Sequence, residues 1–289
     1  MSTRAIDHLV LPTADLDVAR ARLTALGFTV APTGVHPFGT QNACVYLSDG
    51  TFLEPLAIGD AQAAEKAAAA GNVFVARDRE YRDSDGEEGF SALVFASEDA
   101  RADHEEFVAE GISAGDMLTF SRPVADAEGH TDTATFKLAF AADPLAPDLF
   151  FFTCQRKHVP KIDRSALQLH DNGASAIASV VLSAANPAEH TSLVNFVCGG
   201  VAAPVGDTGL GVQTPNAEVL VLGSSELDAV FGVRAPTDGL RLRAIVFRVP
   251  DIDATEALLR SDGIVCRRHG ARLVVPPAPG QGAIFAFEE

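Results

Sequence analysis

The chain has 289 residues, of which 47% are hydrophobic and 21% are charged. This balance is typical of a globular protein with a substantial core, and the length predicts about two domains. The 22 basic and 39 acidic residues give a net charge of −17. A surface this acidic disfavours binding to nucleic-acid phosphates and to anionic lipid, and no apolar run approaches the roughly 18 residues of a membrane helix. We therefore expect neither a nucleic-acid partner nor a membrane partner.

The cysteines and the amino-terminal residues bear on localisation. Cys44, Cys154, Cys198 and Cys266 lie far apart and form no C-x-x-C pair. Thiols of this kind are typical of a reducing compartment. Residues 1–5 lead directly into a strand-like segment, without the apolar stretch and cleavage site of a secretory signal. These features predict a cytoplasmic protein.

An internal repeat organises the sequence. Each of four copies begins with a short strand-like run, and one position within that run is equivalent in all four. These positions are His8, Ala92, Ser179 and Ala244. At a common later offset, three copies carry a glycine followed by an apolar residue. These glycines are Gly27, Gly111 and Gly263, and the third copy has Gly199 one position later.

Each copy is predicted to fold as a strand, a helix and three further strands. In the first copy Asp15 can cap the helix, and the apolar residues from Leu16 to Leu23 form one stripe along it. Gly27 follows the helix and suits the left-handed conformation at a helix end, so we expect the repeat glycines to have positive φ. Strand-like segments such as residues 51–58 come next. The predicted fold is therefore α+β, with four βαβββ modules paired into two lobes.

The spacing of the copies sets the expected boundaries. Residues 1–155 are predicted to form the first lobe from modules one and two, and residues 174–289 the second lobe from modules three and four. Residues 156–173 form a linker that carries a basic patch on an acidic chain. This patch is either a solvated linker or a contact for an anionic substrate. Between modules one and two, an alanine-rich helix at residues 60–70 and a charged stretch at residues 77–88 are expected to be solvated additions.

Several short motifs occur in a fixed order. They are Asp7-His8-Leu9-Val10-Leu11, Leu26-Gly27-Phe28, His36-Pro37, Gly39-Thr40, Asn42, Leu53-Glu54 and the segments at residues 120–124, 151–155 and 170–174. The ordered set resembles the vicinal oxygen chelate superfamily, and in particular its glyoxalase-like domain branch. The resemblance implies glyoxalase/dioxygenase-like lobes with cupped mixed β-sheets around a small-molecule site, often with a divalent metal held by His and Glu. Members include isomerases, lyases, dioxygenases and non-catalytic binding proteins, so the fold alone does not choose a function.

The residue chemistry points to a site in the first module. Strand alternation places His8 and Glu54 on apolar strand faces, where an ionisable group costs free energy unless it is paired or binds a metal. Imidazole and carboxylate together suit zinc, manganese, iron or nickel. His8 and Glu54 are therefore candidate metal ligands and catalytic residues. The alternatives are a buried histidine bonded to backbone, and an ion pair between Glu54 and Arg122. Small residues replace His8 in the other copies, so the second lobe is expected to be degenerate.

A catalytic metal usually takes three protein ligands, and the second module offers no clear third. Gln155, His158 and His36 are the candidates for that ligand. A metal-free site is the alternative, with His8 or His36 as general base and Glu54 as its partner. His36 lies in a turn-like loop, where functional residues concentrate, although it could equally be an exposed loop histidine.

Substrate contacts are predicted from the same motifs. The candidates are Thr40, Asn42, Arg122 and Gln155. Asn42 could orient a substrate carbonyl or could serve as a turn or capping amide.

Two functions are consistent with these residues. One is an enzyme of isomerase, lyase or dioxygenase type that acts on a small oxygenated metabolite in the first-lobe cup, with or without a divalent metal. The other is a non-catalytic protein of the same fold that sequesters a small molecule. The ionisable pair favours the enzyme, because a sequestering cup gains little from charged groups on its inner face. Either protein would be a monomer or a homodimer.

Overall fold

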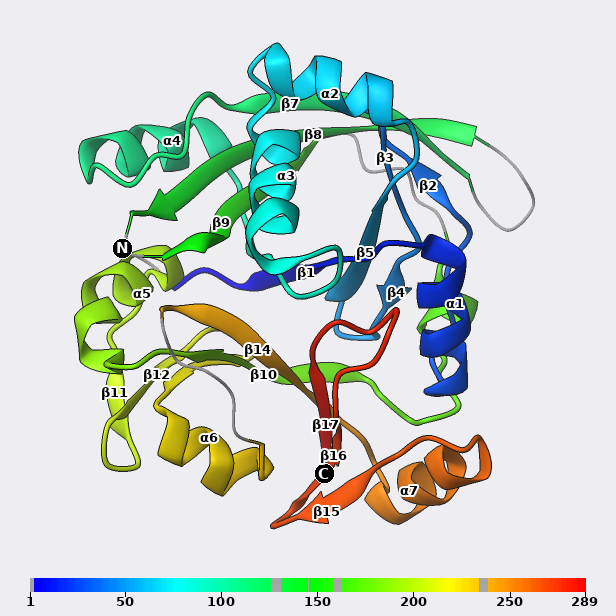
Figure 1. The fold of residues 1–289 in the computed structure, drawn as a ribbon. Coiled ribbons are helices and arrows are strands. Elements are labelled where there is room, and N and C mark those ends of the chain that lie inside the picture. Colours follow the sequence, from blue (N-terminus) through cyan, green and yellow to red (C-terminus); the bar gives the residue numbers. More distant parts are fainter. Residues whose placement is uncertain (1–2, 126–130, 145, 158–162, 234–238) are drawn as a thin grey trace.

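The computed structural model describes residues 3–125, 131–144, 146–157, 163–233 and 239–289. In these residues the chain forms two mixed β-sheets flanked by helices (Figure 1). Strands between Ile6 and Lys157 make the first sheet, and strands between Ala176 and Glu288 make the second. The prediction of an α+β fold with two paired, curved sheets is confirmed.

The first sheet combines modules one and two in the order β2-β3-β5-β1-β6-β9-β8-β7, with β4 paired to β5. Its strands are β1 (Ile6–Pro12), β2 (Gly34–Val35), β3 (Thr40–Asn42), β4 (Val45–Tyr46), β5 (Phe52–Ile58), β6 (Ala92–Ala96), β7 (Leu118–Ala125), β8 (Thr131–Asp143) and β9 (Ala146–Lys157). The first strands of the two modules, β1 and β6, run antiparallel at the centre. Each pairs in parallel with the last strand of its own module, β5 or β9. Both modules thus have the expected strand pairing.

The second sheet repeats this plan in the order β11-β12-β13-β10-β14-β17-β16-β15. Its strands are β10 (Ala176–Ser183), β11 (Ala203–Val205), β12 (Gly209–Gln213), β13 (Glu218–Leu222), β14 (Arg241–Arg248), β15 (Arg267–His269), β16 (Arg272–Val275) and β17 (Ile284–Glu288). The central strands β10 and β14 are antiparallel, and they pair in parallel with β13 and β17. The internal repeat of the sequence is therefore a repeat of sheet topology.

One helix of each module ends as the repeat glycines predict. These helices are α1 (Leu16–Ala25), α4 (Ala100–Ala109), α5 (Thr191–Cys198) and α7 (Ile252–Ser261), and short 3-10 turns occur at Ser165–Gln168 and Pro187–His190. Gly27, Gly111 and Gly263 follow α1, α4 and α7 with φ of 81°, 75° and 71°. Gly199 caps α5 with φ of 65°. A residue with a Cβ is strained in this left-handed conformation, which explains the recurrent glycine.

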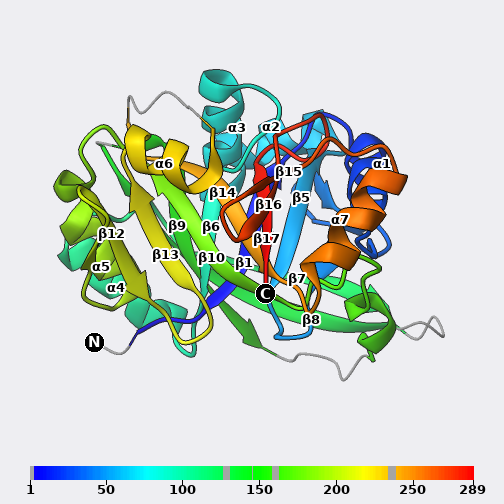
Figure 2. The same cartoon turned by 90° about the horizontal axis from the view of Figure 1, so that it is seen from below.

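The two sheets pack back to back. Alternate residues of the central strands, such as Leu9 and Leu93 in the first sheet and Val180 and Phe247 in the second, belong to one hydrophobic core. The module helices lie at its sides, with α4 and α5 together at one side and α1 and α7 at the other (Figures 1 and 2). The opposite face of each sheet points away from this shared core and has an apolar cluster of its own.

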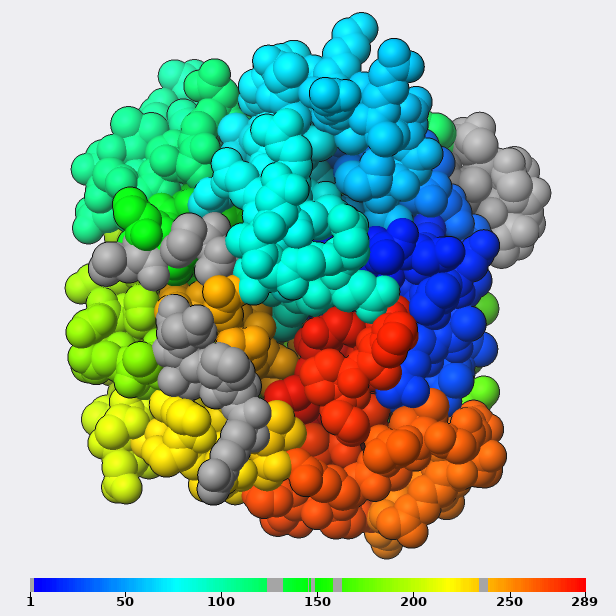
Figure 3. All heavy atoms as spheres, viewed as in Figure 1, coloured from blue at the N-terminus to red at the C-terminus, as the bar shows by residue number. Residues whose placement is uncertain are grey.

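Two helices cover the outer face of the first sheet. They are α2 (Ala61–Ala69) and α3 (Val73–Asp85), and their atoms overlie this part of the molecule in Figure 3. The expectation that residues 60–70 and 77–88 are solvated additions is wrong in part, because Ala64, Asp78 and Tyr81 within these ranges are buried. Val73, Phe74 and Val75 are buried and pack in the cluster of this face. Apolar residues just before the charged stretch anchor the helix to the sheet. A shorter helix, α6 (Ser224–Phe231), covers the second sheet through Leu227 and Phe231.

Two further features concern the chain as a whole. All four cysteines are free thiols. In the ranges that the structure describes, no helix has both the length and the apolar composition needed to cross a membrane.

Candidate functional site

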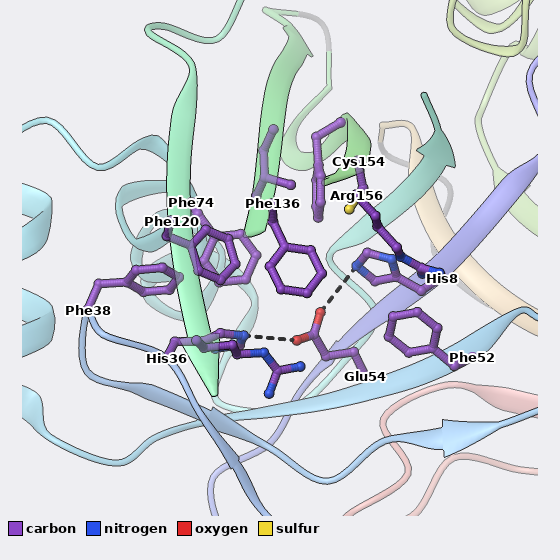
Figure 4. A pocket seen from close by; sticks show the side chains of 13 residues that line it. His8, His36, Phe38, Phe52, Glu54, Phe74, Phe120, Phe136, Cys154 and Arg156 are labelled. Atoms are coloured by element: carbon purple, nitrogen blue, oxygen red, sulfur yellow. Dashed lines mark ion pairs between the residues drawn. The ribbon is translucent and has the colours of Figure 1, made fainter. Parts of the chain in front are cut away.

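A cavity of about 440 Å³, including its open mouth, lies on the outer face of the first sheet. Its wall contains six phenylalanines from several strands, from α3 and from the turn between β2 and β3: Phe38, Phe52, Phe74, Phe120, Phe136 and Phe152. Its polar lining consists of His8, His36, Glu54, Arg122, Cys154 and Arg156. Figure 4 shows Glu54 between the two histidines, with the aromatic rings around them. The site is therefore an apolar pocket with a few ionisable groups converging at one end.

The register of β1 and β5 brings His8 and Glu54 together. His8 is opposite Phe52 and Val10 is opposite Glu54 in this parallel pair, so strand alternation turns all four side chains to one face. His8 Nε2 lies 3.3 Å from Glu54 Oε2, and both side chains are buried. The imidazole ring of His8 also stacks on the ring of Phe52, with 4.4 Å between centroids. The sequence prediction placed these two residues on apolar faces, and the structure places them in one cavity.

A chain of short contacts extends from this pair. His8 Nδ1 donates to Asp7 Oδ1 at 2.6 Å, and Arg156 NH2 donates to the same oxygen at 2.6 Å. On the other side, Asn42 Nδ2 donates to Glu54 Oε1 at 2.6 Å. His8 is thus held between two carboxylates, and each carboxylate has a second donor.

These contacts set the charge of His8 and Asp7. Burial alone would lower the pKa of His8, but its hydrogen bonds to Asp7 and Glu54 outweigh burial and raise that pKa. Burial would likewise raise the pKa of Asp7, but His8 and Arg156 hold it below its usual value. The raised pKa favours the imidazolium form of His8, and the lowered pKa favours the carboxylate form of Asp7.

The pKa values of Glu54 and His36 are both lowered, which favours a charged carboxylate and a neutral imidazole. Burial would raise the pKa of Glu54, yet the hydrogen bond and charge of His8 lower it to about 2. Burial lowers the pKa of His36 to about 4, against the opposing attraction of Glu54. At neutral pH the pocket therefore contains an ionised Glu54 beside a neutral His36.

The neutral ring of His36 has a preferred tautomer. Its Nε2 lies 3.7 Å from Glu54 Oε1, and its Nδ1 lies 2.9 Å from Thr40 Oγ1. A lone pair directed at the carboxylate would be repelled, so we assign the proton to Nε2 and let Nδ1 accept from the Thr40 hydroxyl. His36 then presents an N–H to the cavity.

The other predicted residues are placed as follows. Arg122 lines the cavity, but its side chain is not the ion-pair partner of Glu54 considered above. Thr40 and Asn42 contact His36 and Glu54 and do not line the cavity. Gln155 is not brought into the pocket, because Cys154 faces it and the next side chain on the strand points away, donating to the Glu98 carbonyl. His158 lies outside the described residues.

Asp7 and Phe74 were missed by the sequence reasoning. Strict alternation turns Asp7 away from His8, but the pairing of β1 with β6 shifts register between Ile6 and His8, and this irregularity lets Asp7 reach the imidazole. An acidic residue next to the histidine was the available signal. Phe74 lies between the two segments that were interpreted as solvated, in a stretch to which no role was assigned.

The equivalent positions in the other modules carry no such pair. The register of the parallel strands places Phe152, Leu220 and Ala286 at the position of Glu54. Ala92, Ser179 and Ala244 occupy the position of His8. The ionisable pair is therefore specific to module one.

The residues present do not fit a metal centre of the kind that the resemblance implies. Among the described residues no three His, Cys, Asp or Glu side chains are arranged to hold a metal ion. His8 Nε2 and Glu54 Oε2 could supply two ligands, and the two matching positions in module two are Ala92 and Phe152. His36, the candidate third ligand, lies 3.7 Å from Glu54 Oε1 but does not complete a group of three that could hold a metal. A catalytic metal usually needs three protein ligands and an open position.

Comparisons with known proteins agree with this architecture. A family model described as glyoxalase-like domain matches residues 6–197, well over half of the chain. No curated protein is significantly similar in sequence. A hypothetical protein from Staphylococcus aureus is structurally similar, with a TM-score of 0.67, 14% identity and 98% of each chain covered.

Two similar structures are described as enzymes. One is a mutant of 4-hydroxymandelate synthase from Streptomyces coelicolor, with a TM-score of 0.59, 14% identity and coverage of 99% of this chain and 92% of that chain. The other is the Mn(II)-bound glyoxalase from Novosphingobium aromaticivorans, with a TM-score of 0.53, 12% identity and coverage of 99% and 82%. At these identities the likeness shows the fold alone. The family model covers well over half of the chain and agrees with the four-module fold, so the chain belongs to the glyoxalase-like domain family.

Proposed function

We propose that the first lobe is an enzyme of isomerase or lyase type that moves a proton on a small oxygenated organic compound. The observation that carries the proposal is the buried pair of His8 and Glu54, 3.3 Å apart and facing an apolar cavity, with contacts that favour the charged form of each. Opposite charges held in a desolvated pocket are the arrangement that acid–base catalysis requires. Family membership supports a small-molecule ligand, and similar structures include enzymes.

In this proposal Glu54 is the general base and His8 stabilises the developing oxyanion. A carbonyl oxygen that replaces Glu54 as acceptor of the His8 Nε2 proton would be polarised by a full positive charge. Glu54 would then remove the proton from the carbon beside that carbonyl. Asp7 keeps His8 protonated and oriented from the opposite side, through the 2.6 Å contact to Nδ1.

Substrate entry itself would strengthen the base. A carboxylate with a pKa of about 2 is a weak base, and the low value depends on the contact with His8. When the substrate oxygen takes that contact, the burial of Glu54 is no longer outweighed and its pKa rises. Asn42 still holds Oε1, so the freed Oε2 is the atom that accepts the proton.

His36 and Thr40 would assist without changing charge. The Nε2–H of His36 faces the cavity end that holds Glu54, so it can donate to a second substrate oxygen. The Thr40 hydroxyl fixes this tautomer. A substrate with two neighbouring oxygens, such as a hydroxyketone, fits two separate donors.

The dioxygenase branch of the superfamily is disfavoured by the arrangement of the donors, although His8, His36 and Glu54 are suitable residue types. A non-haem iron oxygenase uses two histidines and a carboxylate on one face of the metal. Among the described residues no group of three such side chains is arranged to hold a metal. Proton transfer needs no further ligand, because the acid and the base are both already in the pocket.

The test is hydrogen exchange into a panel of small hydroxyketones and oxo acids. Each compound is incubated with the protein in D₂O, and loss of the signal of the proton beside the carbonyl is followed by NMR. We expect exchange of at least one compound, and a loss of about 10²-fold or more in Glu54→Gln, the usual size of a general-base effect. Exchange that survives in Glu54→Gln at the wild-type rate would exclude Glu54 as the base.

A second function is favoured by the aromatic wall. Six phenylalanines around one cavity would suit a protein that binds an apolar compound without changing it. This alternative predicts saturable ligand binding with no exchange of any bound compound, and binding that is unaffected by Glu54→Gln.

A further inference from the structure

We infer that the ligand of this cavity is a small aryl carboxylate whose anionic group pairs with Arg122 while its ring lies among the phenylalanines. The inference deepens the proposed function by naming a ligand class for the same cavity. It concerns binding alone, so it can hold even where proton transfer is not observed.

The ionisable groups at the cavity have an excess of positive charge. Arg156 is paired with Asp7. His8, protonated, is paired with Asp7 and Glu54. These four groups balance, with two cations and two anions, and Arg122 then adds one further positive charge. The excess is notable because the whole chain has a net charge of −17.

Arg122 lacks a partner of opposite charge within the described residues. Its Nε is buried and has no hydrogen-bond partner. The guanidinium lies 5.8 Å from the centroid of the Phe136 ring, a contact that contributes little hydrogen-bonding capacity. The titratable groups that interact with it, His36, Cys44 and Tyr46, are uncharged at pH 7, because burial lowers the pKa of His36 and raises the pKa of Cys44 and of Tyr46. Burial therefore removes part of the hydration of the Arg122 guanidinium, and no anion among the described residues compensates for that loss.

The fold makes room for this side chain. Arg122 is on β7 and Gly34 is on β2, the strands at opposite ends of the first sheet's order. The guanidinium lies so close to Gly34 that any Cβ there would collide with it. Rings from the same two regions also meet, since Phe38 and Phe120 are 5.1 Å apart and edge-on. The curved sheet thus brings its two edges together around Arg122.

The shape and chemistry of the pocket favour a carboxylate over a phosphate. A single unpaired guanidinium matches a single planar charge, which it can bind through two parallel hydrogen bonds. A dianionic phosphate would bring a second charge into a wall with six phenylalanine rings, without a cation to balance it. Those rings accept an aromatic group by stacked or edge-on contact.

The matched probes are phenylacetate and phenylacetamide, which share a shape and differ in charge. Binding of each is measured by titration calorimetry at pH 7 and low salt. We expect the wild-type protein to bind phenylacetate about tenfold or more tightly than the amide, the usual size of one charge-assisted hydrogen bond. Acetate, which lacks the ring, should bind more weakly than phenylacetate.

The variants assign the preference to Arg122. In Arg122→Met the preference for the acid over the amide should be lost, while thermal unfolding shows that the variant is folded. The matched control is Arg164→Met, because Arg164 also packs over an aromatic ring, that of Tyr46, but does not line the cavity. This control should keep the full preference. Glu54→Gln, which tests the proposed catalysis, should bind phenylacetate at least as tightly as the wild type.

Three results would overturn the inference. They are equal binding of phenylacetate and phenylacetamide to the wild-type protein, no detectable binding of phenylacetate, or an unchanged preference in Arg122→Met. Failure of the D₂O exchange assay together with an Arg122-dependent preference would reject the proposed catalysis and leave the aryl carboxylate site in place.

Discussion

Replacing Glu54 by glutamine tests whether the His8–Glu54 pair stabilises the fold or is only tolerated by it. The amide keeps the size of the side chain and removes its charge. The pKa of Glu54 falls from its ordinary 4.5 to about 2 in the folded protein. At 1.36 kcal/mol for each pKa unit, this shift corresponds to about 3 kcal/mol of stability at neutral pH. Glu54→Gln should therefore lower the free energy of unfolding at pH 7 by about 3 kcal/mol.

The pH dependence of this loss provides the sharper test. A carboxylate whose pKa is lowered by folding contributes its stability above the unfolded pKa of 4.5, and the contribution disappears as the pH falls towards 2. The difference between wild type and Glu54→Gln should be full at pH 7 and shrink below pH 4.5. Urea unfolding at a series of pH values measures both.

An exposed ion pair provides the matched control. Glu105 pairs with Arg101 at 3.0 Å on the surface of α4, where both side chains are mostly exposed. Glu105→Gln should change stability by less than about 0.5 kcal/mol at any pH, because surface pairs of this spacing contribute little. A Glu54→Gln variant as stable as wild type at pH 7, or a loss independent of pH, would refute the charge assignment in the pocket.

Three other outcomes are expected. Addition of EDTA, Mn²⁺ or Zn²⁺ should leave both the melting temperature and the D₂O exchange rate unchanged, because the described donors are not arranged to hold a metal. A rise in either quantity on adding metal would contradict this. Asn42→Leu should raise the pKa of Glu54, because it removes the donor that lies 2.6 Å from Oε1. The fall of the exchange rate at acidic pH should then begin at a higher pH than in the wild type. An unchanged pH profile would exclude Asn42 as a positioning residue. Gly27→Ala should destabilise the protein by more than Gly111→Ala in thermal unfolding, because both glycines have positive φ but only the Cβ at Gly27 would collide with neighbours; equal losses would show that those contacts relax.

The module plan and the principal pair could be predicted because local rules decide them. A residue that ends a helix in the left-handed backbone conformation is usually glycine, so Gly27 and Gly263 identified the ends of equivalent helices in the repeat. Strand alternation is equally local, and it assigned His8 and Glu54 to inward faces before their strands were known to be neighbours. The family resemblance had the same source, since its motifs lie on these strands.

The rest of the site depends on features that local rules do not determine. The run ending in Cys154 is apolar at successive positions because β9 is buried on both faces, so its sequence did not reveal that Gln155 points away from the cavity. The irregular pairing that turns Asp7 to His8 arises between two strands, β1 and β6, and β10 and β14 repeat it between Ile177 and Ser179. The position of Phe74 depends on how α3 crosses the sheet. Each requires knowledge of a tertiary contact.

The four modules also explain how a charged pair can be accommodated in an apolar face. Three of them show that the sheet needs neither residue, since small or apolar side chains occupy the same two positions. In module two the position equivalent to Glu54 is Phe152, whose ring packs edge-on against His8 at 5.6 Å between centroids. Module two, which has no ionisable pair at these positions, thus supplies part of the apolar wall around the pair in module one. A low-polarity wall strengthens the interaction between His8 and Glu54 and raises the cost of leaving either unpaired. The interaction between His8 and Glu54 in module one therefore depends on an apolar residue at the equivalent position of module two. Phe152→Glu should weaken that interaction, because it would place a second carboxylate beside His8.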